Sequence, residues 1–191
     1  MAYIGMRKPV AAPISAHTDG SAITYGTGFV IGTAVAATIN PEYNDNPDYG
    51  DDIIQDNDNG MNGYTGTMET NDLADSVRAS LLGWASTGTT DIEYHATDAA
   101  APYVGFGFIR VKMFQGTRSY EAFWFHKAQF TEAALNASTK QRQIEWNHPQ
   151  MNITGMGVYL DSTGTARYYD FKSFDTESAA YTWLKSKANI T

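Results

Sequence analysis

The most constraining feature of this sequence is a pair of apolar segments, residues 103–114 and 119–130, separated by four residues, 115–118. Both segments are rich in aromatic and β-branched side chains, which favour strands over helices. The separating residues, Gln-Gly-Thr-Arg, contain the glycine that a tight turn between antiparallel strands needs. The sequence therefore predicts a long β-hairpin at the centre of the fold.

Both faces of this predicted hairpin are apolar. Successive side chains of a strand point to opposite sides. The two faces of the first strand are Ile109, Val111 and Met113 against Phe106, Phe108 and Phe114, and those of the second are Tyr120 and Trp124 against Phe123 and Phe125. Antiparallel sheets often leave one face in water, so two apolar faces predict cover on both sides. A neighbouring subunit is one candidate for the second cover.

Further strands are predicted on both sides of the hairpin. Residues 23–39 favour two short strands joined at a glycine, and residues 144–146 alternate as one half-buried strand does. Residues 152–160 and 166–171 flank an Asp-Ser-Thr-Gly sequence that is typical of a turn, so they predict a second hairpin.

Two helices are also predicted. Residues 71–83 carry an apolar stripe at helical spacing, with Asn71 placed to cap the start and Gly83 the end. Residues 175–188 show the same spacing, with an acidic start and a basic end that suit the helix dipole.

These elements predict one mainly β domain over residues 1–191, a β-sandwich or barrel-like fold with a helix near 71–83 and a C-terminal helix near 175–188. A length of 191 residues suits a single domain. Residues 40–60 interrupt the strands with proline, asparagine and aspartate, which predicts a long acidic loop.

Charge and cysteine content narrow the functional classes. The net charge of −8 opposes binding to phosphate backbones, and the apolar residues are too dispersed for a membrane protein. The chain has no cysteine, which rules out disulfides and thiolate metal sites and favours assembly in the cytoplasm. No apolar run of signal-peptide length follows the first basic residues, so secretion by that route is not expected.

The acidic segment 44–59 is a candidate calcium site, because hard cations bind several carboxylate and amide oxygens. In Asp56-Asn57-Asp58-Asn59-Gly60, however, glycine stands one place early for the helix-loop-helix calcium motif, and the required glutamate does not follow. A solvated loop that contacts a neighbouring ring of subunits is the favoured interpretation.

Local motifs for catalysis are missing. The histidines His17, His95, His126 and His148 are far apart and form no His-Glu-x-x-His pattern, so no metal is assigned, although convergence in space stays open. A serine-hydrolase Gly-x-Ser-x-Gly sequence does not occur. The glycines at 26, 28 and 32 have the wrong spacing for a dinucleotide-binding motif and predict glycine within strands instead.

Other side chains allow two interpretations. The carboxylate pairs Asp51 and Asp52, or Asp91 and Glu93, would suit glycoside hydrolysis in a cleft, but solvated charges on strand edges are the default. The aromatic side chains near 120–125 suit stacking on sugars or bases, but core or interface packing is more common. We therefore assign no catalytic residue, cofactor or metal ligand, and we expect a protein that is not an enzyme.

Four blocks of sequence occur in an order that resembles the major tail protein family of bacteriophages with long non-contractile tails. The blocks are residues 19–26, residues 49–52 leading into 62–69, the helix end at 81–84, and residues 123–132 followed by 139–140. Each block alone is of low specificity, whereas their common order extends over almost the whole chain. The resemblance thus rests on the series of blocks.

This resemblance implies a tail tube subunit whose rings, usually of six copies, stack into a hollow tube for DNA. Implied partners are other copies, a tape measure protein inside the tube, and tail tip or initiator and terminator proteins. DNA would pass without specific binding, and an acidic subunit suits this because few cations would hold the phosphates. The implied location is the virion tail, assembled in the host cytoplasm.

Two other hypotheses stay open. A monomeric β-sandwich that binds carbohydrate on a tail or cell surface would also explain the aromatic side chains and the low charge. An enzyme built on a β scaffold is a third possibility, because a site assembled in space leaves no local motif.

Overall fold

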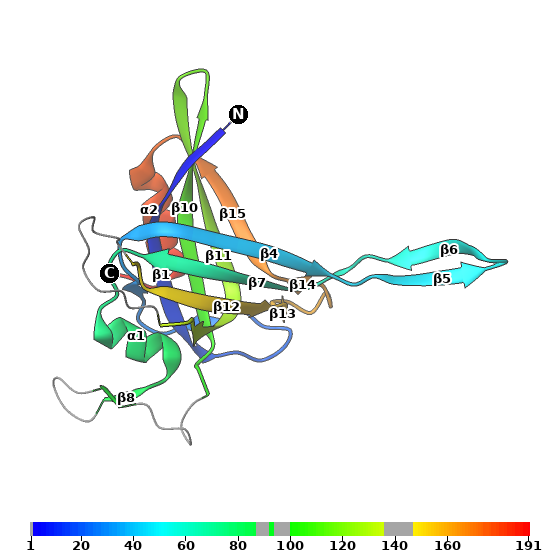
Figure 1. Ribbon diagram of the computed structural model, residues 1–191, viewed down its shortest axis with the longest axis horizontal. Helices are drawn as coiled ribbons and strands as arrows, with labels where there is room; N and C mark the ends of the chain where they lie inside the picture. The colour runs from blue at the N-terminus through cyan, green and yellow to red at the C-terminus, as the bar shows by residue number, and fades with distance from the viewer. Residues whose placement is uncertain (1, 87–91, 94–99, 136–146) are drawn as a thin grey trace.

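The computed structural model of the protein describes residues 2–86, 92–93, 100–135 and 147–191 (Figure 1). The mainly β fold class and both predicted helices are confirmed. The strands of the large sheet are β1 (Ala2–Ala16), β2 (Thr24–Tyr25), β3 (Phe29–Val30), β4 (Ala34–Tyr43), β7 (Met61–Thr70), β10 (Val104–Phe114), β11 (Thr117–Glu132), β12 (Gln150–Met156) and β15 (Tyr169–Phe174). Three short ladders pair β5 (Asn46–Gly50) with β6 (Ile53–Asp58), β8 (Ala85–Ser86) with β9 (Ile92–Glu93), and β13 (Val158–Tyr159) with β14 (Ala166–Arg167).

The large sheet is antiparallel and has the order β2-β1-β10-β11-β12-β7-β4, with β3 also paired to β1 and β15 to β11. The β10–β11 hairpin is confirmed as its centre. Gln115 and Gly116 both have positive φ, so a two-residue turn joins the strands, and Thr117 and Arg118 belong to β11.

The sheet is folded into two crossing layers (Figure 1). Strands β4, β7 and β12 cross β1, β10, β11 and β15 at a steep angle, and β4 contacts β1. The larger core cluster is buried between these layers and includes Tyr64, Phe106, Phe125 and Phe130. Such crossing layers match the expected sandwich or barrel-like architecture.

A bulge in β11 lets this strand belong to both layers. Its residues 120–125 pair with β15, whereas residues 128–132 pair with β12. Between these two parts, β11 has two residues, His126 and Lys127, opposite the single Gly105 of β10. A bulge of this kind bends the strand and interrupts the ladder.

Two tyrosine hydroxyls donate hydrogen bonds to backbone carbonyl oxygens at this bulge, where the ladder with β10 is interrupted. The Tyr25 hydroxyl donates to the His126 carbonyl oxygen at 2.9 Å, and the Tyr64 hydroxyl donates to the Lys127 carbonyl oxygen at 3.2 Å. Buried carbonyls without a partner are costly, so these hydroxyls stabilise the bend.

Helix α2 (Glu177–Lys187) agrees closely with the predicted helix 175–188. The Thr176 side chain accepts a hydrogen bond from the Ala179 amide, which caps the start of the helix. Ala180 and Leu184 are buried in a second core cluster, against Ile109 and Trp124 of the central hairpin. The second apolar face of the hairpin is therefore covered by this chain itself, and it needs no neighbouring subunit.

Helix α1 (Asp75–Leu82) is shorter than the predicted helix 71–83. Gly83 ends it in the left-handed conformation as expected, but the cap at Asn71 is wrong. Residue 74 takes the N-cap position without a side-chain cap, and the Asp72 carboxylate instead accepts the Thr33 amide at 2.6 Å. The tertiary contact to Thr33 therefore holds residue 72 outside the helix.

The predicted acidic loop over residues 40–60 is wrong. Strand β4 continues to Tyr43, and β5 and β6 pair as a hairpin that projects far from the body (Figure 1). Asp51 and Asp52 both have positive φ, as a two-residue turn requires, and aspartate tolerates this conformation better than most residues. We call residues 44–60 the arm.

Two other strand predictions differ from the structure, and a third lies outside the described residues. Residues 23–39 contain three strands, β2, β3 and the start of β4, because glycines separate them. The predicted hairpin of 152–160 with 166–171 is reduced to the β13–β14 ladder, since β12 pairs with β7 and β11 instead. The predicted strand 144–146 lies outside the described residues.

Gly155 of β12 should be intolerant of any side chain. The Tyr64 ring lies over it, and a Cβ at this position would be 1.8 Å from Tyr64 Cζ. We expect Gly155→Ala to displace the ring from the Lys127 carbonyl and to lower the free energy of unfolding by about 1–3 kcal/mol. Urea unfolding followed by fluorescence measures this change.

The matched control is Gly5→Ala in β1, where a Cβ would meet no atom within 4 Å. This variant should stay within about 1 kcal/mol of the wild type, because alanine only restricts the unfolded chain further. Equal stability of the two variants would contradict the role given to the Tyr64 contact.

Candidate functional site

The structure separates the histidines that the sequence singles out. His126 is buried on β11, His17 and His148 are half-buried in segments that flank β1 and β12, and His95 lies outside the described residues. Within the part of the chain that the structure describes, no three or more His, Asp and Glu side chains gather as a possible metal site.

The candidate carboxylates and glycines form no site either. Asp51 and Asp52 occupy the turn of the arm, while Asp91 lies outside the described residues and cannot be placed beside Glu93. Gly28 flanks β3, where a Cβ would meet the Ala188 carbonyl oxygen at 2.0 Å. This glycine therefore allows β3 to pack closely against the end of α2. It lies next to a strand, whereas the sequence predicted it within one.

The aromatic residues near 120–125 are divided between the two faces of the central hairpin. Tyr120 and Trp124 face α2, and Trp124 is fully buried. Phe123 and Phe125 face the other layer, where they belong to the larger core cluster. They do not converge as one binding surface.

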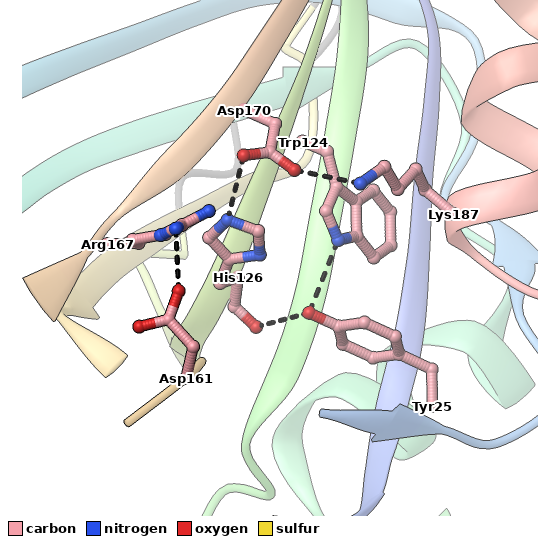
Figure 2. A network of polar contacts seen from close by, with 7 residues as sticks. All are labelled: Tyr25, Trp124, His126, Asp161, Arg167, Asp170 and Lys187. Atoms are coloured by element: carbon pink, nitrogen blue, oxygen red, sulfur yellow. Dashed lines mark hydrogen bonds and ion pairs between the residues drawn. The ribbon is translucent and has the colours of Figure 1, made fainter. Parts of the chain in front are cut away.

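A network of polar side chains joins this core to α2 (Figure 2). Trp124 Nε1 donates to the Tyr25 hydroxyl oxygen at 3.3 Å. His126 Nε2 contacts Asp170 Oδ1 at 3.3 Å, and Lys187 Nζ contacts the other oxygen of Asp170 at 2.8 Å. Asp170 thus links β11, β15 and α2, and this network was not predicted because its members are far apart in the sequence.

Burial and charge shift the pKa values of three groups in this network. Burial raises the pKa of Tyr25 to about 12, so its hydroxyl keeps the proton that it donates. Burial also lowers the pKa of His126, although Asp170 acts in the opposite direction. Burial favours the neutral acid of Asp170, but Lys187 and His126 outweigh it and lower the pKa of this carboxyl.

This network holds parts of the fold together. His126 is only 4% exposed, so a substrate would not reach its imidazole. A neutral histidine beside a carboxylate that Lys187 already pairs holds α2 and the β11 bulge together. Its chemistry therefore supports stability.

A concave surface lined by several aromatic side chains lies between the two layers. It has a volume of about 440 Å³ and is lined by Pro41, Tyr43, Phe108, Phe123, Phe125 and Tyr169, among others. We call this surface the aromatic groove. It starts at edge strand β4 and extends to β10, β11 and β15.

The arm carries the second unusual surface. Tyr49, Ile53 and Ile54 are each 58–64% exposed at its far end, on a hairpin that contains six aspartates and no basic residue. We call these three side chains the arm tip. Sequence reasoning found the acidity of this segment but missed the apolar tip, because its strand pairing was not predicted.

No protein-family model matches this chain, and no curated protein matches it. The likeness to phage tail tube proteins therefore remains a prediction from the sequence blocks. Among the described residues, neither helix has the length and apolar character needed to cross a membrane.

The low pKa of His126 predicts that acid weakens the fold. In the unfolded chain this histidine takes up a proton near its ordinary pKa of 6.5, whereas folded His126 does so only at lower pH. Stability is therefore complete above about pH 6.5 and is lost as the pH falls through the folded pKa. We expect the free energy of unfolding to fall between pH 7.5 and pH 5.5 in urea titrations.

His126→Gln tests the assignment, because glutamine can still donate to Asp170 but does not titrate. The variant should be less stable at pH 7.5, yet its stability should change less over the same interval. An equal loss in the wild type and the variant would assign the acid sensitivity to other groups.

Proposed function

We propose that this chain is a self-assembling structural subunit of the tail tube of a long-tailed bacteriophage, and that its rings stack into a conduit for DNA. Self-assembly is inferred from the arm, whose apolar tip is exposed to water in the single chain. The tail tube itself is inferred from the sequence blocks.

An isolated two-stranded hairpin is marginally stable in water, because it has no apolar face to bury. The arm has this character along β5 and β6, where most residues are exposed. Contact with another copy would bury Tyr49, Ile53 and Ile54, and the same contact would stabilise the hairpin. Assembly therefore has a source of free energy that the single chain does not use.

The edges of the sheet support assembly as well. Among the described residues, β4 pairs only with β7, and β15 pairs only with β11, so each presents an unpaired edge. Unpaired edges bind further strands readily. A ring in which edges of adjacent copies meet would extend the sheet from one subunit to the next.

Within this proposal the other expected partners follow from the tube. A tape measure protein would occupy the lumen, tail tip or initiator and terminator proteins would close the ends, and DNA would pass without specific contacts. The proposed location is the virion tail after assembly in the host cytoplasm. No catalytic step is assigned to any residue.

Removal of the arm tip should abolish assembly without unfolding the body. We expect Ile53→Ser combined with Ile54→Ser to prevent the formation of rings or tubes, because the apolar area that drives the contact is lost. Negative-stain electron microscopy and light scattering over a range of concentrations measure the particles. Circular dichroism should show an unchanged β-rich fold.

Gln55→Ser is the matched control, since it changes a polar side chain on the same strand of the arm. This variant should assemble as the wild type does. Normal tubes from the double serine variant would contradict an arm-driven assembly, and a wild type that stays monomeric at all concentrations would overturn the proposed function.

A second candidate is a monomeric glycan-binding module, and the aromatic groove favours it specifically. Tyr43 and Tyr169 offer aromatic rings for stacking on a sugar, and Arg110 offers hydrogen-bond donors. Open aromatic surfaces of this kind suit carbohydrate as well as protein.

The two candidates differ in what Tyr169→Ala should do. In a glycan module, this variant should lose binding to immobilised glycans, while the wild type binds them as a monomer. In a tail tube subunit, the wild type should show no glycan binding and should form long particles. A glycan array combined with light scattering of the wild type and the variant separates them.

A further inference from the structure

The aromatic groove has one charged side chain among its described lining residues, Arg110. Arg110 contacts Glu121 Oε2 at 2.8 Å, and Lys112 contacts Glu121 Oε1 at 2.8 Å. Two cations thus share one carboxylate, which leaves this group of three with a net positive charge. Because the Arg110 side chain is 38% exposed, a further anion can approach it.

Aromatic rings extend this surface beyond the groove. Phe171 of β15 stacks on Phe123 with ring centroids 5.8 Å apart, and it is 61% exposed. Arg110 lies over the Phe123 ring at 4.9 Å and over the Tyr3 ring at 3.7 Å. The receiving surface is therefore apolar, aromatic and locally cationic.

The arm tip has the complementary chemistry. Tyr49 and Ile54 are cross-strand partners that form one apolar spot, with Ile53 next to the turn. Asp48 precedes Tyr49, and Asp51 and Asp52 form the turn next to Ile53, so negative charge lies beside this spot. An acidic hairpin with an apolar end matches an aromatic groove that contains an arginine.

The arm cannot fill the groove of its own chain in this conformation. It continues the direction of β4 and β7 and points away from the body (Figure 1). The hydrogen bond from the Asn44 amide to the Gly60 carbonyl oxygen, at 2.8 Å, extends the pairing at the base of the arm. A straight, paired hairpin brings its tip to another molecule.

We propose that the aromatic groove of one copy receives the arm tip of a second copy. Tyr49, Ile53 and Ile54 pack against Phe123, Tyr169 and Phe171, and the aspartates of the arm approach Arg110. This inference rests on the proposed self-assembly and deepens it by naming both surfaces of one contact.

The proposed contact joins two different surfaces, the arm tip and the groove, so a bound pair of copies keeps one free tip and one free groove. Such heterologous contacts produce closed rings or open stacks, whereas a self-complementary contact stops at a dimer. The geometry of the contact is thus of the kind that a tube requires.

The natural chain has no cysteine, so single thiols can report this contact without interference. One copy carries Gln55→Cys, an exposed position next to Ile54 of the arm tip, and the other carries Thr38→Cys, an exposed position on the β4 side of the groove. The copies are mixed in equal amounts, allowed to assemble and treated with a short bismaleimide, which avoids the strict geometry of a disulfide. A denaturing gel then reveals linked dimers.

The control mixture replaces Thr38→Cys with Ser186→Cys, an exposed position on α2. We expect linked dimers with Thr38→Cys and none above background with Ser186→Cys. Equal linking of both mixtures, or none in samples whose micrographs contain particles, would overturn the groove as the receiving surface while leaving the proposed function intact. Absence of particles from every sample, the wild type included, would overturn the proposed function and this inference with it.

Discussion

The bulge at His126 and Lys127 is the constraint on which the rest of the fold depends. Strand β11 leaves β15 and joins β12 at this point, and the bend interrupts the ladder with β10. The lost pairing is replaced by two buried tyrosine hydroxyls, Tyr25 from β2 and Tyr64 from β7. Each layer therefore supplies one hydroxyl to the strand that connects them. Because burial raises the pKa of both tyrosines, the donors remain protonated and the bend keeps its partners.

The two crossing layers explain why the apolar faces of the central hairpin have different partners. One face lies in the core between the layers, and the other is covered by α2 through Leu184. The second apolar face of the hairpin therefore provides no surface for self-association. The surfaces that the folded chain leaves open are the arm tip, the aromatic groove and the outer edges of β4 and β15. Assembly is then a property of the finished fold, and each subunit can fold before it meets a neighbour.

Local signals in the sequence predicted the elements that local chemistry determines. The β10–β11 hairpin and α2 were found because strand composition, a glycine turn and the helical spacing of apolar residues are all signals that extend over a few residues. The arm was missed because Asp and Asn favour turns, although here two of them form the turn of a hairpin. The pairing of β12 with β7, the network around Asp170 and the groove join distant segments, so they follow only from the folded chain.

The distribution of charge changes the expected reason why DNA would pass through the proposed tube without binding. The arm contains six aspartates and no basic residue, so the segment proposed to dock on a neighbour carries −6 of the net charge of −8. An acidic lumen cannot depend on those charges if they are used at the contact. Outside the aromatic groove, several cations of the body are paired with carboxylates: Arg78 with Glu132, Arg167 with Asp161 and Lys187 with Asp170. A neighbouring carboxylate offsets the positive charge of a cation, so a paired cation attracts a phosphate less than a free cation does. Within the proposed tube, this pairing would weaken the attraction between these side chains and the passing DNA.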